Sequence, residues 1–167
     1  MRTRAAVFAV LFASSLFVHA QQGCASLPKG TSDIAGTYAD DYGMLEAIST
    51  RFWVSGSMVF EICSIDNAKK RIVAFNNTRN QFGQTAGKFS AFDWTTSDGK
   101  LWYCQIVYDA PTEAAASSAA PANPQSPAAN GCGQFEWSLL IRILPSPNTT
   151  TPLLQRLARP AVKQRNK

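Results

Sequence analysis

The chain has 167 residues, a formal net charge of +5 and a single histidine, His19. This length suits one domain with a real core. Because no histidine follows His19, Ser-His-Asp and Cys-His catalysis and histidine metal ligands are excluded from the rest of the chain. All acidic residues precede residue 137, whereas six basic residues follow Ile141, so the positive charge does not indicate a nucleic-acid-binding core.

Residues 1–20 have the pattern of a cleavable secretory signal peptide. Two arginines precede an apolar run over residues 5–18, and Val18-His19-Ala20 supplies small residues before a cleavage site. The apolar run is short for a membrane span, which needs roughly 20 apolar residues. We therefore expect a secreted product that begins at Gln21 and has no transmembrane span.

Strand-like patterns follow a polar lead-in over residues 21–33. The expected strands cover residues 34–42, 45–54, 58–65, 71–75, 88–95, 100–108 and 135–144. Asp98-Gly99 between two aromatic-rich runs is the strongest hairpin signal in the chain. Together the patterns predict an all-β fold, a small antiparallel barrel or sandwich of about six or seven strands.

Two segments differ from these strands in composition. Residues 109–131 are rich in Ala, Pro and Ser, and predict a surface excursion with a short helix over 112–120 that the prolines end. Residues 145–167 are basic and proline-rich, and predict a disordered tail. The disulfide-linked β-domain is expected to span residues 34–144.

Four cysteines follow the signal peptide, namely Cys24, Cys63, Cys104 and Cys132. An even number in an exported chain favours two disulfides, for which three connectivities exist. We prefer Cys104–Cys132, because it would clamp the excursion between them, and this leaves Cys24–Cys63. No CxxC pair is present, so neither a zinc ribbon nor a thioredoxin-like redox motif is expected.

Aromatic side chains are the candidate ligand-binding residues. They would form a stacking platform for sugars or an apolar pocket, and the alternative is that most of them are core. Among them, Tyr38 and Trp53 are expected to be the more exposed. The candidates are Tyr38, Trp53, Trp94, Trp102 and Trp137.

Carboxylates offer the remaining route to chemistry. Asp40-Asp41 could bind Ca²⁺ or act in a glycosidase-like pair with Asp93 or Glu136. The alternative is that Asp40-Asp41 are turn residues at a strand end. Asp93 alternates with Phe92 and Trp94, and is expected to be solvated or paired with Lys88 or Lys100. We expect no catalytic residue, no metal and no cofactor.

Two triplets match the N-glycosylation pattern, Asn76-Asn77-Thr78 and Asn148-Thr149-Thr150. Asn76 and Asn148 are therefore candidate glycosylation sites if the protein is made in a eukaryotic host.

A series of short motifs occurs in order over residues 34–140. They are Ile34-x-Gly36-x-Tyr38, Ile65-Asp66-Asn67, Phe89-Ser90-x-Phe92-Asp93-Trp94, Leu101-Trp102-Tyr103-Cys104-Gln105 and Gly131-Cys132-Gly133-x-Phe135-x-Trp137-Ser138. This series resembles a family of small exported domains, found in secreted proteins and lipoproteins of bacteria, that has no assigned activity. The resemblance implies a core disulfide between Cys104 and Cys132 and supplies no catalytic residues. Cys24, Cys63 and the basic tail depart from it.

A looser resemblance is to lipocalin-like barrels. Gly36-Thr37-Tyr38 is similar to the Gly-x-Trp with which lipocalins open, and Arg142 lies where they place an arginine near the last strand. This resemblance implies a barrel shape and no particular ligand.

The sequence favours a secreted, non-enzymatic binding domain whose partner is a small molecule, a glycan or an anionic surface. The basic tail would aid attachment to such a surface. The alternatives are a carboxylate-dependent glycan hydrolase and a structural extracellular or matrix protein. Nucleic acid is not an expected partner.

Overall fold

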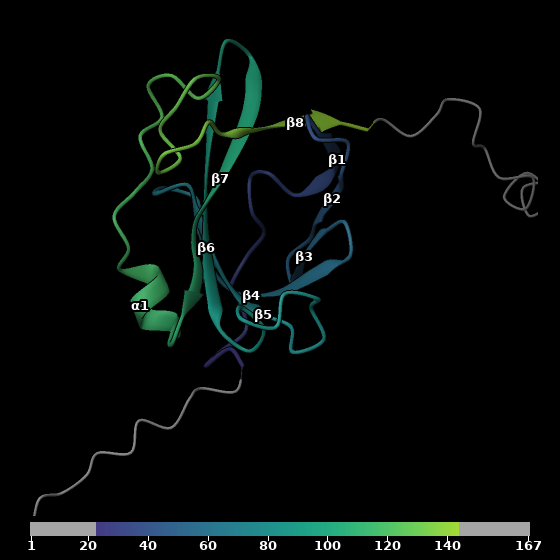
Figure 1. Cartoon of the computed structure of the whole chain (residues 1–167), viewed down its shortest axis with the longest axis vertical. Coiled ribbons are helices and arrows are strands. Elements are labelled where there is room, and N and C mark those ends of the chain that lie inside the picture. Colours follow the sequence, from purple (N-terminus) through teal and green to yellow (C-terminus); the bar gives the residue numbers. More distant parts are fainter. Residues whose placement is uncertain (1–22, 144–167) are drawn as a thin grey trace, which may run out of the picture.

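The computed structural model describes residues 23–143, and these are almost entirely β-structure (Figure 1). The strands are β1 (Gly36–Asp40), β2 (Leu45–Ile48), β3 (Phe52–Ser55), β4 (Met58–Asp66), β5 (Arg71–Asn76), β6 (Phe89–Ser97), β7 (Lys100–Ala110) and β8 (Ser138–Arg142). One short helix, α1 (Glu113–Ser117), lies between β7 and β8 within the described residues. The predicted signal peptide and the predicted basic tail lie outside them.

The strands form a closed barrel in which each strand pairs antiparallel with the next along the chain. Closure occurs where β8 pairs with β1, with Tyr38 opposite Arg142 and Asp40 opposite Leu140. A closed barrel leaves no free sheet edge to pair with another chain. The predicted small antiparallel all-β fold is confirmed, and of the two expected shapes the barrel is the observed one.

Residues 23–143 hold eight strands, and not six or seven, because the strand expected over residues 45–54 is a hairpin. The hydroxyl of Ser49 accepts hydrogen bonds from the backbone N–H groups of Arg51 and Phe52, at 3.2 and 2.9 Å. A serine that bonds to nearby backbone in this way favours a turn over a continued strand. Ile48 and Trp53 then pair across the hairpin, and both are buried.

The hairpin between β6 and β7 forms where Asp98-Gly99 predicted it. Both residues have positive φ angles, 52° for Asp98 and 71° for Gly99. Two successive positive φ angles are typical of the tight turn whose twist matches antiparallel strands, and Asp and Gly tolerate this conformation best.

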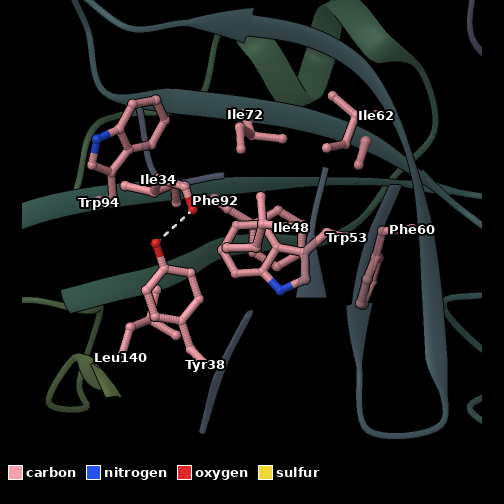
Figure 2. Close-up of a cluster of buried hydrophobic side chains, with 11 residues drawn as sticks. Ile34, Tyr38, Ile48, Trp53, Phe60, Ile62, Ile72, Phe92, Trp94 and Leu140 are labelled. Carbon is pink, nitrogen blue, oxygen red and sulfur yellow. Dashed lines mark hydrogen bonds between the residues drawn. The ribbon is translucent and has the colours of Figure 1, made fainter. Parts of the chain in front are cut away.

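Alternate residues of the strands point into the barrel and fill it (Figure 2). The inward-facing core consists of Ile34, Tyr38, Ile48, Trp53, Phe60, Ile62, Ile72, Ala74, Phe92, Trp94 and Leu140. Its centre is aromatic: Trp53 stacks on Phe92 with ring centroids 4.4 Å apart, and Phe60 meets Phe92 edge-on at 5.1 Å. Such pairs contribute about 0.5–1.5 kcal/mol each beyond their burial.

One part of the outer surface is also buried, because the excursion between β7 and β8 covers it (Figure 1). The hydroxyl of Thr112 caps α1 by accepting a hydrogen bond from the Ala115 N–H at 3.1 Å. Ala116 is fully buried in a cluster with outward-facing residues of β5, β6 and β7. The excursion begins after Ala110, later than predicted, and its short helix forms within the predicted residues 112–120.

Both disulfides predicted from the sequence are present. Cys104 of β7 is bonded to Cys132 of the excursion, and Cys24 of the lead-in is bonded to Cys63 of β4. Each bridge ties an irregular segment to the outer face of the barrel. Buried disulfides of this kind are typical of proteins in oxidising compartments.

Candidate functional site at the barrel mouth

One end of the barrel is closed. Ile34 precedes β1, is 3% exposed, and accepts a hydrogen bond on its carbonyl from the Tyr38 hydroxyl at 2.9 Å (Figure 2). Arg142 lies over the Tyr38 ring, 4.9 Å from its centroid, and donates to the same hydroxyl at 2.7 Å. Gly36 permits this approach, because a Cβ there would lie 2.8 Å from the Arg142 Nη1. Access to the barrel interior is therefore expected at the opposite end.

At that opposite end a cavity of about 660 Å³ opens to solvent. Its walls are residues 81–85 of the loop between β5 and β6, Met58 and Phe60 of β4, and Gln105 and Tyr108 of β7. We call it the mouth cavity. Small-molecule sites in proteins have volumes of roughly 300–1,000 Å³, so its size is suitable for such a ligand.

Large aromatic side chains are exposed at the rim of the mouth cavity. Phe82 is 63% exposed and Tyr108 is 50% exposed, whereas Phe60 at the base is 2% exposed. Phe60 also contacts Phe92 edge-on, with ring centroids 5.1 Å apart, so the base of the cavity rests on the packed aromatic centre of the barrel. The cavity therefore ends at the core and is open only to solvent.

A second cavity, of about 670 Å³, adjoins the mouth cavity and shares Gln105 and Tyr108 with it. Its other wall is formed by residues 120–123 and 130–135 of the excursion. Phe135 on that wall is 65% exposed. The excursion thus widens the mouth on the side of β7.

Asn80 holds the loop that forms the first wall of the mouth cavity. Its side chain bonds to both backbone groups of Val59, accepting from the N–H at 2.8 Å and donating to the carbonyl at 2.9 Å. This side chain takes the place of a neighbouring strand at the start of β4. The base of the loop is therefore fixed, while Phe82 at its middle stays exposed.

Asn76 fixes the other end of the same loop. Its Nδ2 donates to the carbonyls of Thr85 at 2.9 Å and Tyr108 at 2.7 Å, and its Oδ1 accepts from the Ser90 hydroxyl at 2.7 Å. The residue is 1% exposed. The predicted glycosylation site at Asn76 therefore has no room for a sugar in the folded barrel, because Nδ2 is the atom that would carry it. Asn148 lies outside the described residues.

A carboxylate is buried inside the barrel at Glu46, which the sequence analysis did not single out. It accepts hydrogen bonds from the Trp53 Nε1 at 2.6 Å, the Ser55 hydroxyl at 2.6 Å and the Tyr103 hydroxyl at 3.4 Å. Burial raises the pKa of Glu46, and these donors act in the opposite direction. The sequence does carry a signal: Glu46 is two residues before Ile48, so it shares the inward face of β2.

The aromatic residues predicted to bind a ligand are divided between the two faces of the sheet. Tyr38, Trp53 and Trp94 point into the barrel, whereas Trp102 and Trp137 pack with Cys104 beneath the excursion. The expectation that Tyr38 and Trp53 are exposed is wrong: they are 1% and 0% exposed, because the alternation of β1 and β3 turns both inward. None of the five lines the mouth cavity.

Asp93 is neither solvated nor paired with a lysine. It is 4% exposed, and its carboxylate binds Arg71 through two contacts, Nε to Oδ1 at 2.7 Å and Nη2 to Oδ2 at 2.9 Å. The expectation failed because the excursion covers this outer face of β6. Lys88 lies near Asp109 instead, at 3.8 Å.

The Asp40-Asp41 pair serves the turn after β1. Asp40 Oδ1 accepts from the N–H groups of Tyr42 at 3.0 Å and Met44 at 2.6 Å, and Asp41 accepts from the Leu139 N–H at 3.1 Å. Asp40 is buried on the inward face, whereas Asp93 is beneath the excursion. These two carboxylates therefore do not form the pair that a glycosidase needs. Glu136 is exposed, two residues before β8.

Within residues 23–143, no group of three or more His, Cys, Asp and Glu side chains is arranged to hold a metal ion. The described part of the chain also contains no helix of the length and apolar character needed to cross a membrane. Comparison with protein family models, curated proteins and solved structures finds no match for this chain.

Proposed function

We propose that this chain is an exported, non-enzymatic binding protein that holds a small, largely apolar molecule in the mouth cavity. The observation that carries the proposal is the pair of half-exposed aromatic side chains, Phe82 and Tyr108, on the rim of a cavity whose base is Phe60. Exposed apolar surface around a concavity is unfavourable in water and is typical of a binding site. A ligand with an acyl or aromatic body would cover this surface.

Polar groups at the mouth cavity would orient such a ligand. Gln81, Gln84 and Gln105 each contribute an amide to the lining. The Gln105 Nε2 donates to the Ser90 hydroxyl at 3.0 Å, which leaves its carbonyl oxygen as an acceptor at the cavity. A ligand with a hydroxyl or amide at one end fits this arrangement better than a pure hydrocarbon. A glycan is the less suitable partner, since most of the exposed lining surface of the mouth cavity is apolar.

The non-enzymatic assignment is supported by the hydrogen bonds and the ion pair in which the candidate carboxylates Asp40 and Asp93 take part. Asp93 is bound by Arg71 and by the Ala122 N–H, and Asp40 accepts two backbone hydrogen bonds. A general acid or nucleophile has to be free to approach a substrate. The hydrolase alternative would thus have to rely on Glu136 and Asp41, which are both exposed and lie close to Tyr42 at the turn after β1, or on the buried Glu46.

The lipocalin-like character is part of the proposal. Eight antiparallel strands in sequential order, with Arg142 placed over the aromatic ring of the Gly36-Thr37-Tyr38 segment, support it. Export is supported by the two disulfides and by the signal-peptide pattern of residues 1–20.

The test is a binding titration of the oxidised chain from Gln21 with N-phenyl-1-naphthylamine, an uncharged apolar dye that fluoresces when it leaves water. Phe82→Ser and Tyr108→Ser are each expected to weaken dye binding about tenfold. Phe52→Ser is the matched control, because Phe52 is also exposed, at 42%, but begins β3 at the closed end. Neutral lipids, aromatic alcohols and glycans are then compared by displacement of the dye.

Equal weakening in all three variants, or none in the two mouth variants, would place dye binding elsewhere and overturn the proposal. A folded protein that binds neither the dye nor any displacing compound would instead favour the structural role in the extracellular space. Thermal unfolding of each variant without the dye separates loss of binding from loss of fold.

A further inference from the structure

The closed end of the barrel carries a cavity of its own, separate from the mouth cavity. It has a volume of about 660 Å³ and lies on the outer side of the Tyr38 side chain, which closes this end. The tip of the β6–β7 hairpin, the β4–β5 turn and β8 surround it. No residue lines both this cavity and the mouth cavity. We call it the closed-end pocket.

The base of the closed-end pocket is apolar. Trp94 and Leu140 are 4% exposed, Ile34 is 3% exposed, and Leu101 is half-buried beside them. Figure 2 shows Trp94, Ile34 and Leu140 grouped around the Tyr38 hydroxyl at one end of the core. These side chains come from β6, β8, β7 and the segment before β1, so the base is fixed by the barrel itself.

The rim of the closed-end pocket is basic. Lys70 of the β4–β5 turn, Lys100 at the start of β7 and Arg142 of β8 line it, and all three are exposed. No salt bridge involves any of them within the described residues, where the ion pairs are Lys69–Asp66, Arg71–Asp93 and Lys88–Asp109. The lining holds a single carboxylate, Asp33, against these three cations.

Most N–H groups of the Arg142 guanidinium remain able to donate hydrogen bonds to a ligand. Its Nη2 donates to the Tyr38 hydroxyl, and among the described residues the guanidinium makes no other hydrogen bond. Stacking on Tyr38 fixes the plane of the guanidinium, so the remaining N–H groups are held in place for an anion.

We propose that the closed-end pocket binds an anionic amphiphile: a carboxylate or phosphate group at Lys70, Lys100 and Arg142, with an apolar body on Trp94, Leu101 and Leu140. Charge complementarity selects the anion, and the apolar base selects against small hydrophilic anions. Either a free amphiphile or an anionic lipid within a bilayer supplies this chemistry. Ile141 and Ile143, which are 53% and 46% exposed next to Arg142, extend the apolar surface on the same strand end.

The first experiment uses decanoate, below the concentration at which it forms micelles, and measures binding to the chain from Gln21 by calorimetry. The double variant Lys70→Gln with Lys100→Gln is expected to weaken decanoate binding about tenfold. The control, Arg79→Gln with Lys88→Gln, removes the same charge from the other end of the barrel and should leave binding unchanged. Decanol, which has the same chain without the charge, should bind equally to both variants.

The second experiment replaces decanoate by vesicles, either of phosphatidylcholine alone or with one quarter phosphatidylglycerol. It is done with Arg156, Arg159, Lys163, Arg165 and Lys167 changed to Gln, so that only the barrel can attract the surface. Loss of vesicle binding in the Lys70/Lys100 variant would identify a bilayer lipid as the source of the anion. Vesicle binding that is absent throughout, with decanoate binding retained, would identify a free amphiphile.

Two results would overturn the inference. One is that neither decanoate nor vesicles bind the chain with Lys70 and Lys100 intact. The other is that the two double variants weaken binding equally. If Tyr108→Ser abolishes decanoate binding and the lysine variant does not, the anion enters the mouth cavity and the closed-end pocket is not its site. Conversely, the lysine variant should leave binding of the uncharged dye at the mouth unchanged. Failure of one site is therefore distinguishable from failure of the other.

Discussion

Arg71 and Asp93 lie directly opposite each other on β5 and β6, and form a two-contact ion pair on the outer face of the barrel. The same guanidinium donates to the carbonyls of Ser117 at 3.1 Å and Ala119 at 2.7 Å, and the carboxylate accepts from the Ala122 N–H at 3.0 Å. This pair therefore joins the sheet to the excursion that covers it. It has a structural role that the sequence analysis did not assign to Asp93.

Replacing Asp93 by Asn should lower the free energy of unfolding by about 3–5 kcal/mol, because the Arg71 charge stays buried without its partner. Urea denaturation at neutral pH measures the change. Asp109→Asn is the control: Asp109 is exposed and 3.8 Å from Lys88, so its loss should cost less than about 1 kcal/mol. Equal effects of the two substitutions would contradict a special role for the Arg71–Asp93 pair.

The stability of the barrel should fall as pH rises from mildly acidic to neutral, because of Glu46. Burial raises the pKa of Glu46 in the folded state above its value in the unfolded chain. The folded state therefore holds this proton more tightly, and the contribution to stability is full below the unfolded pKa and is lost as pH rises through the folded pKa. Denaturation curves at a series of pH values from 4 to 8 would follow this loss.

Glu46→Gln should remove that pH dependence without unfolding the barrel. The amide oxygen can still accept from Trp53, and the amide nitrogen can donate to Ser55 or Tyr103, whose hydroxyls can rotate. Glu46→Ala should instead cost about 1–3 kcal/mol at every pH, since the Trp53 Nε1–H would then be buried without an acceptor. A Gln variant with the pH profile of the original chain would show that another group titrates.

Local signals in the sequence were sufficient for most of the fold. The Asp98-Gly99 turn, the alternation along β4 and β5, and the cysteine positions 104 and 132 each point to structure formed by nearby residues. The hairpin at Ser49 was missed because the apolar runs on either side are contiguous in pattern, and a serine turn is a weak signal within such a run. That omission alone accounts for the missing strand.

The site could not be predicted in the same way, because it depends on which strands become neighbours. The Tyr103 hydroxyl meets Glu46 only because the barrel closes between β8 and β1. Likewise, Phe82 and Tyr108 are far apart in sequence and share a cavity only through the fold of the loop after β5. The tryptophan and tyrosine residues predicted to bind a ligand are buried instead. In a barrel this small, most large aromatic side chains are needed to fill the core.

Arg142 should stabilise the closed end of the barrel more than its exposure suggests. Arg142→Lys is expected to lower the free energy of unfolding by about 1–2 kcal/mol. The planar guanidinium both stacks on the Tyr38 ring and donates to its hydroxyl, whereas a lysine ammonium group cannot make both contacts. Thermal unfolding provides the measurement. Arg51→Lys, at an exposed arginine next to β3, should have no measurable effect; a similar loss at both positions would argue against a specific Arg142–Tyr38 contact.

The Cys104–Cys132 bridge should determine how firmly the excursion covers the barrel. The bridge spans 28 residues, and removing it through Cys104→Ala with Cys132→Ala should cost about 3–4 kcal/mol. Limited proteolysis of residues 118–131 should also become faster, since the cluster of Trp102 and Trp137 would lose the sulfur atoms of the bridge that packs with it. The comparison variant is Cys24→Ala with Cys63→Ala, which frees the lead-in; because Cys63 and Ala25 contact α1, cleavage of residues 118–131 should rise in it too, but less than in the Cys104/Cys132 variant. Equal cleavage rates in the two variants would mean that the excursion opens only when the whole barrel unfolds.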